Sequence, residues 1–166
     1  AFKARDAAKG KKEPDADAWK RLNYLLDRQA PARLDLKVHA QVILTKNMPE
    51  HGLVNGSRGV VIDFQTKVRV VGEYGVSDGR YSAAVVRFDT GQTMTVTPAS
   101  FCAWTFGGEA TRVQLPLKLA WALTVHKSQG MTLSRAEIQV ADAFADGQAY
   151  VALSRVTSLA GLWTAG

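Results

Sequence analysis

The feature that most constrains the fold is a β-rich region between positions 34 and 112. Its short segments alternate apolar with polar residues or are rich in β-branched residues, as strands are, and turn-forming residues separate them. The five segments expected to be strands are residues 36–46, 60–64, 83–88, 93–97 and 101–105. Short strands joined by tight turns are typical of a small antiparallel barrel, which we expect here.

Two turn signals refine this region. Asp89 and Gly91 lie between the third and fourth expected strands and predict a hairpin turn, because Asp and Gly accept the backbone conformations of a tight turn. Residues 73–80 are rich in glycine and predict a flexible excursion between the second and third strands.

One amphipathic helix is expected before the β-rich region, over residues 16–29. Large apolar residues recur there at helical spacing, and Pro31 ends the pattern. These apolar residues are Trp19, Leu22, Leu25 and Leu26. Residues 1–18 are largely polar and contain Gly and Pro, so we expect a flexible connection up to the start of the helix.

From position 115 the pattern changes to that of an α/β protein. Residues 119–130 (LAWALTVHKSQG) begin as an uncharged apolar run and become polar at His126. We interpret the run as a buried strand and its polar end as a ligand site, because ligands of open α/β sheets bind at the carboxyl ends of strands. Residues 136–140 predict a second strand, and residues 147–155 (GQAYVALSR) predict a helix.

Composition limits the possible partners. The net charge is +6, and residues 1–33 carry +4 of it, which favours an anionic partner or, equally well, a solvated basic tail. Cys102 is the single cysteine and no Cys/His cluster has zinc spacing, so we expect no structural metal. No apolar run approaches the ~20 residues of a membrane span, and we expect an intracellular protein.

The polar end of residues 119–130 has the chemistry of a phosphate site. Lys127 and the backbone N–H groups around Gly130 can hold phosphate oxygens. Further groups able to bond to phosphate or to one another are His126, Ser128, Gln129 and Thr132. An ordinary polar turn after a buried strand explains the same residues. No GxxxxGK[ST] loop occurs in the chain, so an ATPase phosphate loop is absent from it.

Arg155 has two interpretations that the sequence leaves open. It complements the dipole at the carboxyl end of a helix, or it serves as an arginine finger for a γ-phosphate. The three histidines are scattered and Cys102 has no partner, which excludes covalent catalysis from our expectations. Trp104, Trp121 and Trp163 could stack on bases, but apolar neighbours favour core packing for Trp121.

Two C-terminal stretches together resemble a known family. Residues 115–133 (LPLKLAWALTVHKSQGMTL) and 147–162 (GQAYVALSRVTSLAGL) resemble motifs V and VI of superfamily 1B helicases, in particular the petite-integration-frequency DNA helicases, relatives of RecD. Residues 36–47 and 52–64 are similar to the segment that opens that family's inserted barrel, and residues 2–6 resemble the stretch before it.

The resemblance implies a fold of the mixed α/β plus all-β class. A small antiparallel SH3-like barrel is expected as an insert in an incomplete RecA-like second domain of the P-loop-NTPase type. Residues 1–33 would be the connector and short helix of that second domain, residues 34–114 the inserted barrel, and residues 115–166 the part with motifs V and VI. The sequence lacks an initiator Met and predicts no element after Trp163, so we expect a fragment.

The resemblance also implies function. Such a protein is an ATP-dependent 5′-to-3′ DNA helicase in replication, repair, recombination and telomere maintenance. Arg155 would be the catalytic arginine finger, with Gln129 and Gly130 near the nucleotide. The residues expected near the DNA backbone are Thr124, His126, Lys127, Ser128 and Thr132.

Partners follow from the same resemblance. They are ATP and Mg²⁺, bound mainly by a first RecA-like domain of the same protein, and single-stranded, forked or quadruplex DNA. We expect a monomer without membrane contact, in the nucleus or mitochondrion of a eukaryote.

Two departures from the family pattern matter. His39 stands where these helicases commonly carry glycine, and the Walker A and B motifs are missing from this chain. We therefore expect the chain alone to be inactive. The alternative is a non-catalytic nucleic-acid-binding or protein-docking module derived from a helicase.

Overall fold

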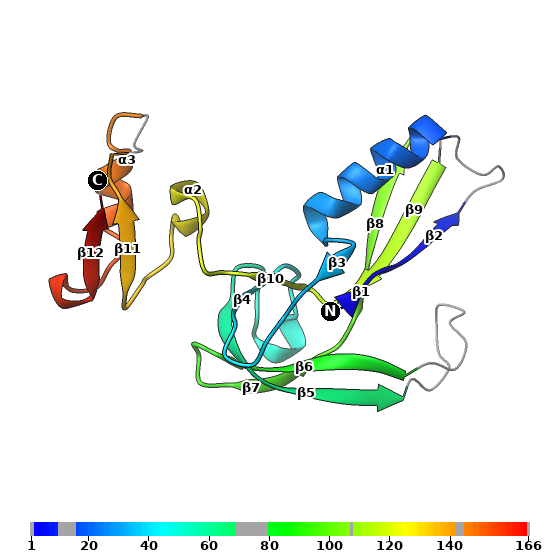
Figure 1. Cartoon of the computed structure of the whole chain (residues 1–166), viewed down its shortest axis with the longest axis horizontal. Helices are drawn as coiled ribbons and strands as arrows, with labels where there is room; N and C mark the ends of the chain where they lie inside the picture. The colour runs from blue at the N-terminus through cyan, green and yellow to red at the C-terminus, as the bar shows by residue number, and fades with distance from the viewer. Residues whose placement is uncertain (1, 10–15, 69–79, 107, 142–144, 166) are drawn as a thin grey trace. The chain divides into compact units, whose positions relative to one another are not determined.

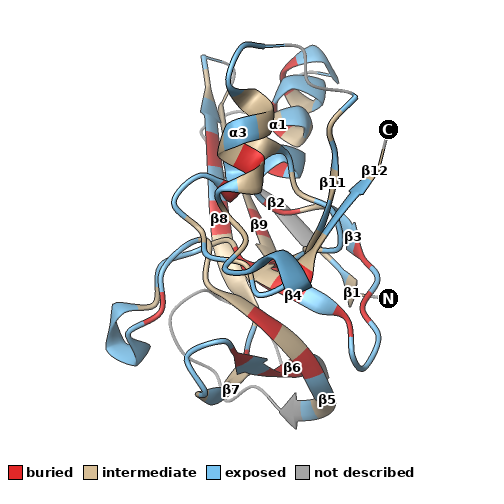
Figure 2. Ribbon diagram, turned by 90° about the vertical axis from the view of Figure 1, so that its left-hand side faces the viewer, coloured by how far each residue is buried: buried red, intermediate tan, exposed pale blue. Residues whose placement is uncertain are grey.

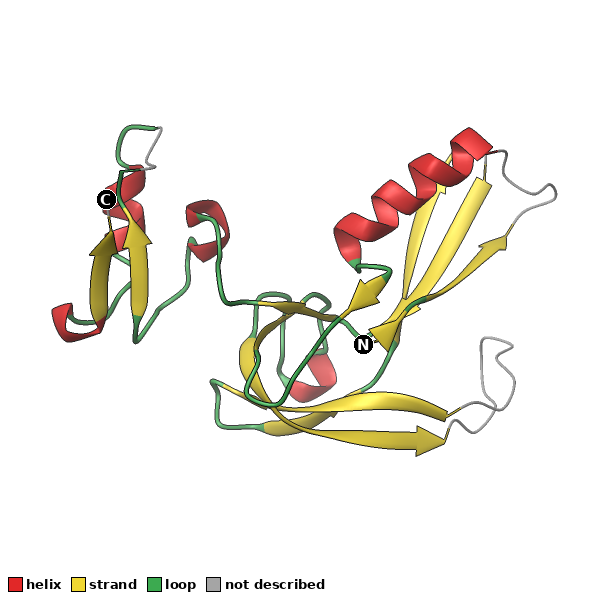
Figure 3. Cartoon of the chain, in the orientation of Figure 1, coloured by secondary structure: helices red, strands yellow, loops and turns green. Residues whose placement is uncertain are grey.

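The computed structural model describes residues 2–9, 16–68, 80–106, 108–141 and 145–165. The chain divides into two compact units, Ala1–Trp121 and Ala122–Gly166 (Figures 1 and 3). The first unit is rich in strands, and the second combines short helices with a pair of strands. The glycine-rich excursion predicted at 73–80 lies, apart from position 80, outside the described residues.

The first unit contains a five-stranded antiparallel sheet in the order β10-β4-β5-β6-β7 (Figure 1). Its strands are β4 (Gln41–Leu44), β5 (Arg58–Val68), β6 (Arg80–Phe88), β7 (Thr93–Val96) and β10 (Leu117–Leu119). Four of the five predicted strands lie in this sheet. A short 3₁₀ helix, η1 (Pro49–His51), lies in the connection between β4 and β5.

One face of this sheet forms the larger hydrophobic core. On β4, Val42 and Leu44 are buried and Gln41 is exposed, which is the period-two burial of a strand with one face toward a core. Figure 2 shows the buried positions in red, among them several on β6. The buried residues of this core are Leu34, Leu36, Ala40, Val42, Leu44, Leu53, Val61, Ala84, Val86, Phe88, Val96, Leu115 and Leu117.

The hairpin between β6 and β7 has the predicted turn. Gly91 has φ 87°, in the left-handed region that glycine tolerates. The Phe88 N–H donates to the Gln92 carbonyl at 2.8 Å, and the Gly91 N–H donates to the Phe88 carbonyl at 2.9 Å. The turn signal in the sequence is confirmed.

The strand predicted at residues 36–46 is shorter in the structure, because a turn precedes it. His39 in this turn has φ 69°, and its N–H donates to the Val61 carbonyl at 2.7 Å. Regular pairing with β5 begins only at Gln41. A positive φ is strained for a residue with a side chain, whereas glycine adopts it at little cost. This explains why glycine suits the position in the helicases that the sequence resembles.

The first unit also contains a three-stranded antiparallel sheet in the order β2-β9-β8 (Figure 1). Its strands are β2 (Arg5–Lys9), β8 (Ala99–Thr105) and β9 (Gly108–Gln114). The fifth predicted strand is therefore β8, which lies in this second sheet and not with the other four. Residues 5–9 were expected to be part of a flexible connection; that expectation is wrong, because they pair with β9.

Helix α1 (Ala16–Gln29) has the predicted boundaries and packs on β8 and β9. Leu22 and Leu26 are fully buried against Phe101, Ala103 and Ala110. The amphipathic pattern is thereby confirmed, with Trp19 and Leu25 at the margin of this second core.

Two polar residues of β9 are buried, and they explain why the sequence did not predict this strand. Arg112 is 2% exposed and donates from Nη1 to the Asp27 carboxylate and, at 3.0 Å, to the Ala30 carbonyl. This arginine fixes the end of α1 onto the sheet. Arg112 occupies a buried position of the strand, where an alternating pattern would have an apolar residue. The sequence of β9 therefore does not show the apolar–polar alternation of a half-buried strand.

Gln114 connects the same strand to a two-stranded antiparallel sheet of β1 (Phe2–Lys3) and β3 (Arg33–Leu34). Its Nε2 donates to the carbonyls of Phe2 and Pro31, at 3.2 and 3.1 Å. The buried side-chain amide of Gln114 therefore provides hydrogen bonds to carbonyl groups that come before and after α1 in the chain.

The second unit has α/β character. Its elements are α2 (Val125–Ser128), β11 (Ala136–Gln139), α3 (Gln148–Leu153), η2 (Leu159–Gly161) and β12 (Leu162–Ala165). Strands β11 and β12 pair in parallel, and α3 lies in the connection that parallel pairing requires (Figure 1). The strand predicted at 136–140 and the helix predicted at 147–155 are both present with shorter bounds, as β11 and α3, whereas β12 was not predicted.

The buried strand predicted from residue 119 to 125 is wrong. Strand β10 ends at Leu119, and α2 begins at Val125. Trp121 between them is 62% exposed, so the core packing expected for this tryptophan is also wrong. Apolar residues in a short run do not distinguish a strand from a connection that ends in one helical turn.

Candidate nucleotide and nucleic-acid interface

The HKSQG residues begin within α2, a single turn of helix. Thr124 precedes the helix in an extended conformation, with φ −70° and ψ 153°. Its carbonyl accepts hydrogen bonds from the N–H groups of Lys127 and Ser128, at 2.9 and 3.1 Å. The polar residues are therefore presented by a helical turn and not by a loop at the end of a strand.

A tight turn follows the helix. Gln129 has φ −60° and ψ 129°, Gly130 has φ 78°, and the Met131 N–H donates to the Ser128 carbonyl at 2.9 Å. These values correspond to a type II turn, which needs a positive φ at its third residue. The positive φ explains the glycine at position 130. Close packing does not explain it, because a Cβ there would meet no other atom within 4 Å.

Most of the predicted contact residues lie on the surface. Exposed residues of this set are Thr124, His126, Lys127, Gln129, Gly130 and Thr132. Ser128 differs: it is 7% exposed, and its Oγ donates to the Val125 carbonyl at 2.8 Å. The structure therefore turns the Ser128 hydroxyl inward while its neighbours face solvent.

The backbone N–H groups of this segment are largely used within it. Those of Lys127 and Ser128 bond to Thr124, that of Gln129 donates to the His126 carbonyl at 3.4 Å, and that of Met131 closes the turn. Side chains, above all that of Lys127, are consequently the groups of this segment most available to an anion.

Arg155 follows the carboxyl end of α3 and is half-buried. Its Nε donates to the Val151 carbonyl at 3.1 Å, and its Nη2 donates to Ser154 Oγ at 2.9 Å. Ser154 Oγ in turn donates to the same Val151 carbonyl at 2.9 Å. The guanidinium thus folds back on the last turn of its own helix.

The second unit brings Arg155 and the HKSQG segment into one framework. Helices α2 and α3 contact each other. The Leu133 N–H donates to the Arg155 carbonyl at 2.8 Å, and the Thr157 N–H donates to the Leu133 carbonyl at 2.9 Å. The chain after Gly130 is therefore paired directly with the chain around Arg155.

The three tryptophans considered for base stacking are all exposed. Trp104 on β8 is 69% exposed, Trp121 62%, and Trp163 on β12 53%. Trp104 and Trp121 belong to the first unit and Trp163 to the second, so they do not form one stacking platform within a unit.

Within the described ranges, no group of three or more His, Cys, Asp or Glu side chains is placed to hold a metal ion. Over the same ranges, no helix has the length and apolar character to cross a membrane.

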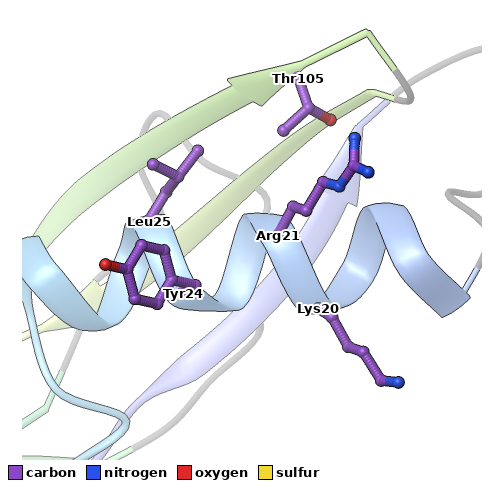
Figure 4. Close-up of a pocket in the computed structure, with 5 residues that line it drawn as sticks. All are labelled: Lys20, Arg21, Tyr24, Leu25 and Thr105. Carbon is purple, nitrogen blue, oxygen red and sulfur yellow. The ribbon is translucent and has the colours of Figure 1, made fainter.

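A further pocket lies in the first unit, between α1 and the end of β8 (Figure 4). It is an open cavity of about 430 Å³, and its lining residues are Lys20, Arg21, Tyr24, Leu25 and Thr105. Of these residues, only Leu25 was named from the sequence, as part of the apolar side of the predicted helix. The available signal was the i, i+1, i+4 spacing of Lys20, Arg21 and Tyr24 on the polar side of the predicted helix.

Comparison with known proteins gives a consistent family. A family model described as the 2B domain of the DNA helicase Pif1 matches residues 24–64, which run from the middle of α1 into β5. The ATP-dependent DNA helicase PIF1 of Danio rerio is 48% identical over 141 residues, covering 82% of this chain and 20% of that protein. The human protein of the same name is 45% identical over 150 residues, covering 88% and 22%. The chain thus spans about a fifth of the length of these relatives.

Solved structures agree over almost the whole chain. The Pif1 helicase of Candida albicans matches with a TM-score of 0.72 and 34% identity, covering 98% of this chain and 38% of that one. A Bacteroides Pif1 helicase, in complex with ADP-AlF3 and single-stranded DNA, matches with a TM-score of 0.62 and 26% identity, covering 99% and 34%. Sequence and fold agree, and the chain belongs to the Pif1 family of DNA helicases.

Proposed function

We propose that the protein containing this chain is an ATP-dependent DNA helicase with 5′-to-3′ polarity, and that this chain supplies its arginine finger and part of its single-stranded DNA surface. The observation that carries the proposal is the contact of α2 with α3 in one compact unit, which places the HKSQG segment and Arg155 in one framework. Relatives named ATP-dependent DNA helicase, at 45% and 48% identity, support it.

The proposed architecture is an SH3-like barrel inserted in the second of two RecA-like domains. The antiparallel β10-β4-β5-β6-β7 sheet with its own core supports the barrel, and the parallel β11–β12 pair supports the RecA-like part. We assign residues 1–33 to the connector, 34–114 to the insert and 115–166 to the part with motifs V and VI. Pairing of β2 with β9 joins the connector and the insert in one sheet.

Arg155 is the proposed catalytic residue. ATP with Mg²⁺, held mainly by the first RecA-like domain of the same protein, supplies the γ-phosphoryl group that passes to water. A guanidinium beside that group stabilises the negative charge of the transition state. To do so, Arg155 exchanges its bonds to Ser154 and Val151 for charge-assisted bonds to phosphate, which are the stronger kind.

The HKSQG segment is the proposed link between nucleotide and DNA. Gln129 and Gly130 face the nucleotide in this proposal, and the residues proposed to bind the DNA backbone directly are Thr124, His126, Lys127 and Thr132. The exposed Lys127 contributes the charge. Ser128 contributes through the fold of α2, because its hydroxyl bonds to the Val125 carbonyl.

The proposed partners are single-stranded, forked and quadruplex DNA, bound by a monomer. The proposed roles are replication, repair, recombination and telomere maintenance, in the nucleus or mitochondrion. The family relationship supports them.

A strand-displacement assay tests the proposed function. Full-length protein is mixed with ATP, Mg²⁺ and a duplex that carries a single-stranded tail at either the 5′ or the 3′ end of the tracking strand. We expect displacement from the 5′-tailed duplex and much less from the 3′-tailed one. Displacement only from the 3′-tailed duplex contradicts the polarity, and ATP-independent binding without any displacement supports the docking module instead.

A further inference from the structure

The outer side of α1 carries a cluster of cations around one exposed aromatic ring. Lys20, Arg21 and Tyr24 lie one turn apart or less on this side, and Arg28 follows Tyr24 by one further turn. All four are exposed, whereas Leu22 and Leu26 on the opposite side are fully buried. We call these four residues the α1 outer patch.

The ring in this patch is open to a partner. Tyr24 is 64% exposed, which is unusual for a large aromatic residue on a helix that otherwise buries its apolar side chains. An exposed ring offers a face on which a base can stack, and such stacking tolerates any base.

The cations come before and after the ring along the helix, with Lys20 and Arg21 one turn or less before Tyr24 and Arg28 one turn after it. Arg21 extends toward the end of β8 that carries Thr105, whereas Lys20 extends away from the sheet (Figure 4). In the part of the chain that the structure describes, no ion pair involves Lys20, Arg21 or Arg28. Asp27, the acidic residue between Tyr24 and Arg28, is engaged by the buried Arg112 and does not neutralise the patch.

Part of the charge of the basic amino-terminal region lies on a folded element. Residues 1–33 carry +4 of the net charge, and α1 within this region is a packed element of the first unit, not a solvated tail. The charge of Lys20, Arg21 and Arg28 is therefore held on a packed helix, and Lys20 and Arg21 line the open cavity of about 430 Å³.

We propose that the α1 outer patch is a second binding surface for single-stranded DNA, separate from the HKSQG segment, on which Tyr24 stacks on a base while Lys20, Arg21 and Arg28 bind phosphates. The combination of cations with an intervening aromatic ring is that of surfaces that bind single strands without sequence preference. This inference rests on the proposed DNA helicase function, because it takes the same ligand, but it assigns that ligand to different residues.

The test measures binding of the full-length protein to fluorescent oligo(dT) over a range of salt concentrations. Two variants probe the patch: Tyr24→Ala, and the double variant Lys20→Glu/Arg21→Glu. Tyr24→Phe keeps the ring, and Lys37→Glu/Arg87→Glu makes the same charge change at exposed positions of the same unit, away from α1. Because all substituted side chains are exposed, we expect the Tm of each variant to match that of the parent.

We expect Tyr24→Ala to weaken binding by about five- to a hundredfold and Tyr24→Phe to leave it nearly unchanged, since stacking depends on the ring. The double reversal on α1 should make the negative slope of log K against log salt shallower by about 1.4, which is ~0.7 for each lost phosphate contact. The control pair should leave the slope close to that of the parent. Ultraviolet crosslinking to bromouracil-substituted DNA should label the peptide that contains Tyr24.

Equal affinity and equal slope for the α1 variants and the control pair overturn the proposal, and so does an unlabelled α1 peptide. In that case the patch serves another partner, such as an acidic protein surface. The outcome is separable from the proposed function: parent protein that displaces strands while the α1 variants bind normally refutes only this inference. If the parent protein binds DNA through α1 but never displaces a strand, only the proposed helicase function is refuted.

Discussion

The two units differ in the size of their hydrophobic cores. All but one of the buried hydrophobic residues described belong to the first unit, and Ala152 is the exception. The second unit is held mainly by backbone pairing, in the β11–β12 ladder and the bridge between Leu133 and Val156. It also carries every residue proposed to contact the nucleotide. The site thus lies on the part with the smaller core, which suits an element that responds to a ligand.

The largest expected effect contrasts leucines of the two units. Leu44→Ala removes a fully buried side chain from the first core and should cost about 2–5 kcal/mol of unfolding free energy. Leu153→Ala in α3 removes a half-buried one and should cost no more than about 2 kcal/mol. Hydrogen exchange of the amides in each unit measures the stability lost by each variant. Equal losses for the two variants would contradict the difference in core size between the units.

A smaller effect concerns close backbone packing in the second unit. A Cβ at Gly161 would lie 2.0 Å from the Ser134 carbonyl oxygen, so Gly161→Ala must displace backbone and should cost about 1–3 kcal/mol. Gly130→Ala meets open space and suffers only from its positive φ, at about 1–2 kcal/mol. Exchange protection of β11 amides should fall more for Gly161→Ala; the reverse order would show that this contact is not tight.

The smallest effect is a gain in the first unit. His39→Gly replaces a residue at φ 69° by one that adopts this conformation easily, and its exposed side chain loses little. We expect about 0.5–1 kcal/mol of added stability, after the entropy that glycine gains in the unfolded chain is subtracted. Denaturant titration measures it, and a loss of stability would mean that the imidazole makes a contact worth more than the strain.

The sequence predicted those elements whose pattern is complete within a few neighbouring residues. Helix α1 follows from the spacing of Leu22 and Leu26, and the β6–β7 turn from Asp89 and Gly91, because each pattern is complete within a few residues. The proposed site residues were predicted from their chemistry and from resemblance to motifs V and VI. Their presentation by a helical turn was not, because four residues are too few to show a helical period.

Elements that depend on distant partners were missed. Strand β9 buries Arg112 and Gln114, whose polar groups are satisfied by Asp27, Ala30 and Phe2 from far along the chain. Strands β2 and β12 are short and gain their identity only from pairing with β9 and β11. No local window of sequence contains those partners.

In the proposed function, Arg155 completes the ATPase site of the full-length protein. The most direct measurement is the steady-state rate of ATP hydrolysis at saturating ATP and single-stranded DNA, for the parent, Arg155→Ala and Arg155→Lys, with DNA affinity measured alongside. We predict that turnover falls by about 10³-fold or more in both variants, since lysine lacks the planar fork of arginine, while DNA affinity stays close to that of the parent. Turnover that is unchanged in Arg155→Ala would contradict the account.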